Sequence, residues 1–233
     1  MKMTKNKLAK GFTLVELLVV IAIIAALAAL STPVVLKQQK KAAATEAVNN
    51  AKQHFILLFE FDQDNGAYPG AAAVNPSGVL SGDSNSAFRE FFIGSQIDSE
   101  DIFYAKTGWS VKPDGDIGAA PTFTTALAAN ECGFIYHMKG ADEAFGTTAA
   151  SATPLVSTPA IDNAFTGTEF SVNAFGGRAV ILFNDGAVKS LAITEGSTAG
   201  QGVVNVKVAG VDTSLFTAAN PALAAATTNL PAL

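Results

Sequence analysis

One carboxylate lies inside the most apolar stretch of the chain. The run from Phe12 to Leu30 has 19 residues, of which only Thr13 and Glu16 are not apolar. A charged carboxylate costs ~2.5–3.5 kcal/mol in the middle of a bilayer and less near its surface. Pairing with a positive charge recovers much of this cost. We therefore predict that Glu16 is a functional residue with a charged partner.

Few other residues have the types and spacing needed for chemistry. Cys132 is the single cysteine, so the chain has no intrachain disulfide and no site of several cysteine ligands. We expect it to be buried, as free cysteines usually are. His54 is predicted on a solvated helix face and His137 in a strand, and neither has a partner at catalytic spacing. No nucleophile elbow or phosphate-binding loop is present.

Acidic side chains recur between residues 98 and 116. Hard cations such as Ca²⁺ bind clustered carboxylates. The competing interpretation is that these acids form a solvated surface. The candidate calcium ligands are Asp98, Asp101, Asp114 and Asp116.

The charge of the chain is unevenly distributed. The formal net charge is −5, and the first eleven residues hold four lysines and no acid, which leaves 11 basic and 20 acidic side chains elsewhere. Nucleic-acid binding requires clustered Lys and Arg, so we expect no nucleic-acid partner. With 49% hydrophobic and 15% charged residues, disorder throughout is excluded.

The apolar run has the length of a membrane-spanning helix, which needs about 20 residues. The preceding lysines would stay in the cytoplasm by the positive-inside rule and send the rest of the chain across the inner membrane. A cleaved secretory signal peptide and an ordinary anchor are the alternatives. The small residues of AALAALS, residues 25–31, offer a signal-peptidase site, but an acid early in the apolar core disfavours a secretory peptide.

The N-terminal motif carries a family resemblance. Residues 10–16, KGFTLVE, resemble position for position the processing site of type IV pilins and of the pseudopilins of type II secretion. The shared pattern is a basic leader, Gly, Phe, an acid at the fifth mature position and a long apolar run. Residues 64–69, DNGAYP, are similar to the stretch that follows the long helix in major pseudopilins.

This resemblance implies a route of processing and assembly. A prepilin peptidase would cut between Gly11 and Phe12 and methylate the new Phe12 amine, so that residues 1–11 are a leader peptide. Glu16 would pair with the N-terminal amine of a neighbouring subunit. The alternative is an intramolecular pair between Glu16 and Phe12, four residues apart on one helix face. The implied partners are the peptidase, other pilin or pseudopilin subunits in a homopolymer, and an inner-membrane assembly platform.

A long helix is predicted to continue beyond the membrane segment. Pro33 lacks a backbone donor and clashes with the preceding turn, so we expect a kink or local melting there. Asn65 and Gly66 suit the left-handed conformation that ends helices. The spine helix is therefore predicted at residues 12–64, with 12–32 as the transmembrane or polymerisation part. Its apolar stripe beyond the kink is expected to be Val48, Phe55 and Leu58.

Residues 65–233 are predicted to form a globular head. The expected fold class is α+β and pilin-like, with one long kinked N-terminal helix packed on an antiparallel sheet. A short helix that Ser84 or Asn85 caps and that runs through Ile93 places three phenylalanines on its apolar face. These are Phe88, Phe91 and Phe92.

Strand signals gather late in the chain. Residues 132–138 and 202–208 are expected strands, and residues 178–194 form a hairpin whose turn, Asn184-Asp185-Gly186, supplies the required positive φ. Residues 140–176, rich in Ala, Thr, Ser, Pro and Gly, are predicted to be a long surface excursion. The uncharged tail from Thr217 is expected to be an irregular arm or contact segment.

Three functions fit these features. The first is a filament subunit without enzymatic activity or cofactor, as a type II secretion pseudopilin. The second is a surface type IV pilus subunit with an adhesion role for the loops of residues 140–176. The third is a membrane-tethered periplasmic enzyme, for instance a glycan hydrolase with two carboxylates.

Overall fold

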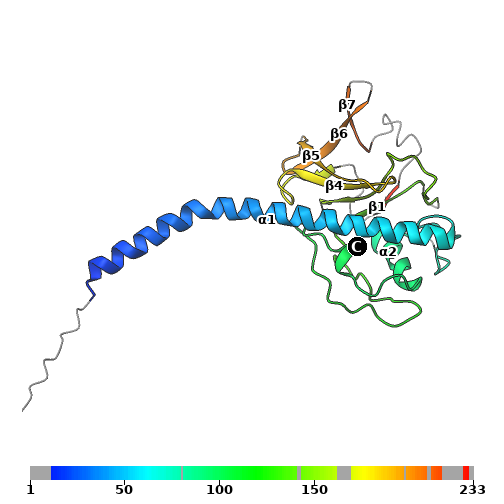
Figure 1. The fold of residues 1–233 in the computed structure, drawn as a ribbon, viewed down its shortest axis with the longest axis horizontal. Helices are drawn as coiled ribbons and strands as arrows, with labels where there is room; N and C mark the ends of the chain where they lie inside the picture. Colours follow the sequence, from blue (N-terminus) through cyan, green and yellow to red (C-terminus); the bar gives the residue numbers. More distant parts are fainter. Residues whose placement is uncertain are drawn as a thin grey trace, which may run out of the picture. The chain divides into compact units, whose positions relative to one another are not determined.

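The fold is α+β, as predicted: one long helix, a short helix and an antiparallel sheet (Figure 1). The chain divides into two compact units, residues 1–39 and 40–233, and helix α1 (Leu14–Asn65) contributes to both. In this computed structural model the described residues are 12–79, 81–140, 143–161, 169–196, 198–208, 211–216 and 228–230.

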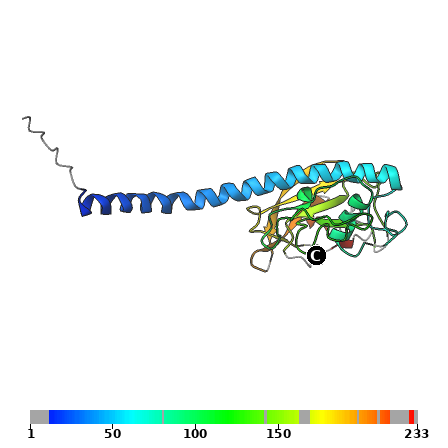
Figure 2. The same ribbon diagram turned by 90° about the horizontal axis from the view of Figure 1, so that it is seen from below.

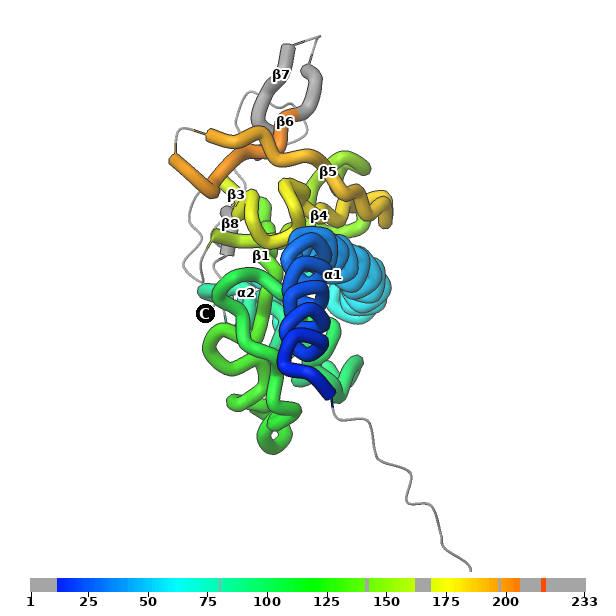
Figure 3. The backbone as a smooth tube through the Cα atoms, turned by 90° about the vertical axis from the view of Figure 1, so that its left-hand side faces the viewer, coloured from blue at the N-terminus to red at the C-terminus, as the bar shows by residue number. Residues whose placement is uncertain are grey.

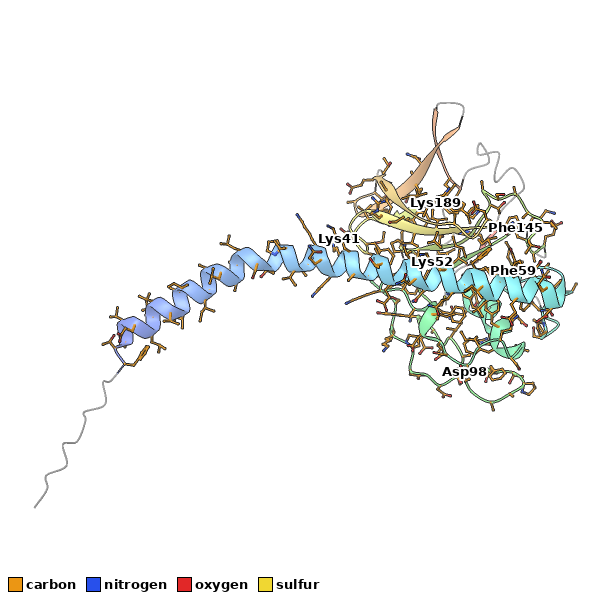
Figure 4. All side chains as sticks on the ribbon, viewed as in Figure 1. Lys41, Lys52, Phe59, Asp98, Phe145 and Lys189 are labelled. Atoms are coloured by element: carbon orange, nitrogen blue, oxygen red, sulfur yellow. The ribbon has the colours of Figure 1, made fainter. Side chains whose placement is uncertain are left out.

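The N-terminal part of α1 exposes apolar side chains on every side (Figure 4). Within the described residues, α1 is the one helix long and apolar enough to cross a membrane. Helix α1 runs through Pro33 without interruption, so the local melting expected there is wrong, whereas the kink stays a prediction. Proline removes a single helical hydrogen bond, and the turn before it gains two others, from the hydroxyls of Ser31 and Thr32 to the Ala28 carbonyl, at 3.1 and 2.8 Å.

The buried face of α1 in the head begins with small residues. Ala43, Ala47 and Ala51 follow one another every four residues and are buried. Of the predicted stripe, Leu58 is buried but Val48 and Phe55 are only half-buried. Both pack against the same core, so the predicted stripe is confirmed in part, but it missed the three alanines because it followed the largest apolar side chains.

Helix α1 ends where Asn65 and Gly66 predicted. Gly66 has a φ of +85° and its N–H donates to the Asp62 carbonyl at 2.8 Å. This left-handed glycine satisfies a carbonyl of the last turn.

Helix α2 (Ser84–Ile93) buries the three predicted phenylalanines. Its N-cap is Asp83 rather than Ser84 or Asn85, because the Asp83 carboxylate accepts the Ser86 N–H at 2.7 Å and the Ser86 hydroxyl accepts the Asp83 N–H at 3.2 Å. Such reciprocal bonds form a capping box. The adjacent Ser84 instead accepts the Tyr136 N–H of the sheet at 2.9 Å.

The sheet is antiparallel throughout, in the order β3-β6-β5-β4-β2-β1-β8, with β7 paired to β6 (Figures 1 and 2). The predicted hairpin is confirmed as β4 and β5, and the strand at 202–208 as β6. The strand expected at 132–138 begins later, as β1. The strands are β1 (Ile135–Met138), β2 (Pro154–Thr158), β3 (Glu169–Ser171), β4 (Arg178–Phe183), β5 (Val188–Glu195), β6 (Gln201–Val208), β7 (Val211–Ser214) and β8 (Thr228–Leu230).

The surface excursion predicted for residues 140–176 is wrong in part. It contains β3 and the fully buried β2, which lies between β1 and β4. Strand β2 is short and begins with Pro154, so its sequence lacks the long apolar run that predicts a central strand. Residues 162–168 and most of the tail from Thr217 lie outside the described residues, although 228–230 form β8.

Alternate residues of the central strands face two different cores. Val180 and Leu182 of β4 face α1 and α2, whereas Ala179 and Ile181 pack against Val204 and its neighbours on the other face. In Figures 1 and 3 strand β4 lies nearer to the head part of α1 than β5 does. Successive side chains of a strand point to opposite faces of the sheet. One core therefore lies between the sheet and the helices, and a second lies on the other face, where the sheet curls over itself.

Two sequence motifs that are far apart in the chain meet at the end of α1. The Tyr68 hydroxyl donates to Asn184 Oδ1 at 2.7 Å, and both groups are buried. Asn184 Nδ2 donates to the Ala149 carbonyl at 2.8 Å, and Asp62 Oδ2 accepts the Thr147 hydroxyl at 2.7 Å. The segment after α1, the hairpin turn and the loop at 147–153 are thereby fixed to one another.

We predict that Tyr68→Phe lowers the free energy of unfolding by about 1–3 kcal/mol, because Asn184 Oδ1 becomes a buried acceptor without a donor. Urea unfolding of the full chain in dodecyl maltoside, followed by the fluorescence of the single tryptophan, Trp109, measures this. Tyr104→Phe is the control, since among the described residues the Tyr104 hydroxyl forms no hydrogen bond. Equal stability of the two variants would contradict the assignment.

His54 is fully buried, which corrects its predicted place on a solvated face. Its ring stacks on Phe103 at 5.0 Å between centroids, and its Nε2 lies 3.0 Å from the Ile102 carbonyl. Burial lowers the pKa of His54 from 6.5 to about 3, because desolvation disfavours the imidazolium.

His137 lies in β1, as predicted. Cys132 is buried, also as predicted, and desolvation raises the pKa of its thiol to about 12.

A pH-dependent loss of stability follows for His54. Between pH 6.5 and about 3 the unfolded chain binds a proton that the folded chain does not. The free energy of unfolding contributed by this residue therefore falls as pH falls, by up to about 1.4 kcal/mol per pH unit, and is constant above pH 6.5. Urea unfolding at several pH values between 7 and 4 measures this dependence. The free energy of unfolding of His54→Leu should lack the part of the pH dependence that His54 contributes, whether the variant is more or less stable than the wild type at pH 7. A variant with the wild-type slope would refute the burial of a neutral imidazole.

Candidate functional site

The predicted processing site lies at the edge of the described residues. Gly11 is outside them, Phe12 is exposed and α1 begins at Leu14. Thr13 is therefore the residue before the first helical turn, and Glu16 is the third residue of α1. The predicted functional acid thus occupies the end of the helix, where backbone N–H groups lack intrahelical partners.

Thr13 and Glu16 form a reciprocal capping box. The Thr13 N–H donates to Glu16 Oε2 at 2.9 Å, and the Thr13 hydroxyl donates to the same oxygen at 2.7 Å. The Glu16 N–H lies 3.2 Å from Thr13 Oγ1, which accepts from it. The sequence pattern Thr-x-x-Glu carries this signal, and our sequence analysis missed Thr13 as a partner of the acid.

The capping box bears on both predicted partners of Glu16. In the uncut chain the Phe12 nitrogen is a peptide nitrogen and carries no charge. The carboxylate here bonds to Thr13 instead, so pairing with a Phe12 amine requires cleavage and stays a prediction. The Glu16 carboxylate therefore already has hydrogen-bond donors before processing.

The four calcium candidates are exposed on loops, and Asp98 is marked on the loop after α2 in Figure 4. Asp114 Oδ1 accepts the Asp116 N–H at 2.8 Å, and Asp116 Oδ1 accepts the Gly118 N–H at 3.1 Å. Asp101 begins the short 3-10 helix at 101–103. Within the described part of the chain no three His, Cys, Asp or Glu side chains form a metal-binding group. Calcium binding stays an untested prediction.

Two buried glutamates, which the sequence did not single out, organise the same loops. Glu100 accepts the backbone N–H groups of Leu127 and Gly115, at 2.5 and 3.1 Å. Glu131 accepts those of Ala128 and Asp114, at 2.7 and 3.3 Å. Burial raises the pKa of Glu100, although its hydrogen bonds oppose the shift. These acids fix loop backbone and leave few free lone pairs for a ligand.

Comparison with known proteins identifies the N-terminal segment. Residues 6–32 match the family described as the prokaryotic N-terminal methylation motif, which is the signature of type IV pilins and pseudopilins. The match covers Gly11, Phe12, Glu16 and the apolar run. No curated protein and no solved structure matches the chain.

Loss of the cap should loosen the first turn of α1. We predict that Thr13→Val costs about 0.5–2 kcal/mol of local stability. The variant loses the hydrogen bond from the Glu16 N–H to Thr13 Oγ1 and the one from the Thr13 hydroxyl to Glu16 Oε2. Thr13→Ser keeps the hydroxyl and serves as the control. Amide hydrogen exchange in detergent micelles should be faster at Glu16 and Leu17 in the valine variant only. Equal exchange in both variants would show that the capping box does not form.

Proposed function

We propose that this chain is a structural filament subunit, processed between Gly11 and Phe12 by a prepilin peptidase and assembled through α1. The observation that carries the proposal is the methylation motif at residues 6–32, joined without a break to a membrane-length apolar helix. The precursor would wait in the bacterial inner membrane with its lysine-rich N-terminus in the cytoplasm and its head in the periplasm.

We further propose a type II secretion pseudopilus as the filament. The similarity of residues 64–69 to major pseudopilins supports this, as does the single cysteine, because many surface pilins close their C-terminal region with a disulfide. The surface-pilus alternative relied on free loops at 140–176. Part of that segment is the buried β2, and the loop at 147–153 is fixed to Asp62 and Asn184.

An enzymatic role has little support from the head. A glycan hydrolase needs two carboxylates free to face one substrate. Glu100 and Glu131 are buried and engaged with backbone N–H groups. The motif instead indicates a subunit whose activity is assembly.

The processing step gives the first test. We expect the mature protein to begin at Phe12 and to exceed the mass of residues 12–233 by one methyl group. Intact mass and N-terminal sequencing of the purified membrane protein measure both. A start near Ala28 or Ser31, or an uncut Met1, would overturn the proposal.

Glu16→Gln separates the two roles of the acid. Glutamine at the third helical position still completes a capping box, but it carries no charge. We expect the variant to insert and to be cleaved normally, with wild-type exchange at Leu17, while filament yield falls about tenfold or more because the ion pair is lost. Thr13→Val should show the opposite pattern, a weakened cap with the charge intact. Normal filaments from Glu16→Gln would refute the pairing role.

A further inference from the structure

A groove of about 460 Å³ lies beside α2 in the head. This volume is within the range of small-molecule sites. Two parts of the chain line it: residues 76–79 and 81 together with one face of the α2 helix that follows them, and residues 121–122. The apolar walls are Pro76, Val79, Ile93 and Pro121, and the charged groups are Arg89 and Glu90.

The walls of the groove are held in place before any ligand arrives. Asn75 is buried, accepts the Gly70 N–H at 2.7 Å and donates to the Val79 carbonyl at 2.6 Å. Ser77 donates its N–H and its hydroxyl to the Glu90 carboxylate, at 3.0 and 2.5 Å. The loop is thus tied both to itself and to α2. Little ordering would be required on binding.

Arg89 brings unused hydrogen-bond donors to this groove. It is half-buried, and its Nε donates to the Ala126 carbonyl at 3.0 Å. In the described part of the chain neither terminal nitrogen of Arg89 has an acceptor, and no carboxylate forms an ion pair with it. Arg178, by contrast, donates from both Nε and Nη2 to Ser190. The Arg89 guanidinium therefore keeps the planar pair of donors that matches a carboxylate.

Glu90 does not neutralise Arg89, because both of its oxygens are engaged by Ser77. Its negative charge nevertheless disfavours strongly charged anions in the same groove, and the apolar walls disfavour strongly hydrated ones. We propose that this groove binds an organic monocarboxylate with a small apolar body, whose carboxylate is held by Arg89 and whose body lies against Pro76, Val79 and Pro121. This site is separate from the filament function proposed above.

Ligand-observed NMR on the full chain in dodecyl maltoside tests the proposal with 3-methylbutanoate as the probe. We expect saturable binding to the wild type and at least about tenfold weaker binding of the neutral amide of the same shape. Arg89→Gln should weaken binding of the acid about tenfold or more, and Arg89→Lys less, since lysine keeps the charge without the planar donors.

Arg178→Gln is the matched control, because it removes the other arginine of the head outside the groove, and it should bind as the wild type does. The proposal is wrong if the wild type does not saturate, if the amide binds as tightly as the acid, or if Arg178→Gln loses binding equally. It is also wrong if a folded Arg89→Gln, judged by Trp109 fluorescence, keeps wild-type affinity. Should Arg89→Gln not fold, the lysine variant decides: wild-type affinity for the acid in a folded Arg89→Lys would refute recognition by the planar donors.

Discussion

The head depends on one core that the buried face of α1 shares with α2 and the sheet. Ala43, Ala47 and Ala51 present a stripe of methyl groups to this core. Farther along the helix, the hairpin turn meets Phe55, and a Cβ on Gly186 would lie 2.8 Å from the Phe55 ring. Gly186 also has a φ of +77°, so the turn needs glycine for two reasons. Helix, turn and sheet register are therefore set together.

Buried polar side chains form hydrogen bonds with the backbone N–H and C=O groups that apolar packing leaves unpaired. Asn50 and His54 reach from α1 to carbonyls of the segment at 101–104, while Glu100 and Glu131 each accept two backbone N–H groups of the loops that follow. Irregular backbone can be buried only if its N–H and C=O groups find partners. The long loop region between α2 and β1 is therefore held by these four side chains together with Asn85 and Arg89 of α2, and regular secondary structure contributes little.

Local signals in the sequence predicted local structure well. The Asn-Gly end of α1, the Asn-Asp-Gly hairpin and the spacing of the α2 phenylalanines all specify conformation through neighbouring residues. The burial of β2 depends instead on pairing with β1 and β4, which no short window contains. His54 was misplaced because a polar residue was assumed to be solvated, although its spacing to Leu57, Leu58 and Phe61 is that of a buried face. The predicted processing site at Gly11, Phe12 and Glu16 lies in one short segment with a known pattern, whereas the groove at Arg89 depends on residues 121–122 lying beside α2.

The capping box changes the energetic argument for Glu16 in the proposed filament. If the carboxylate lacked partners in the membrane, relief of that cost would drive assembly. It already accepts two hydrogen bonds from Thr13, so pairing with a neighbouring amine exchanges partners rather than supplying the first one. The apolar helix gains little hydrophobic free energy either, because lipid tails are as apolar as the neighbouring helices. Neither term is large, so in the proposed filament a separate assembly machine would supply the work of extracting subunits. Glu16 would then act mainly on register, because only a neighbour whose cleaved N-terminus lies beside it offers a charge in place of the cap.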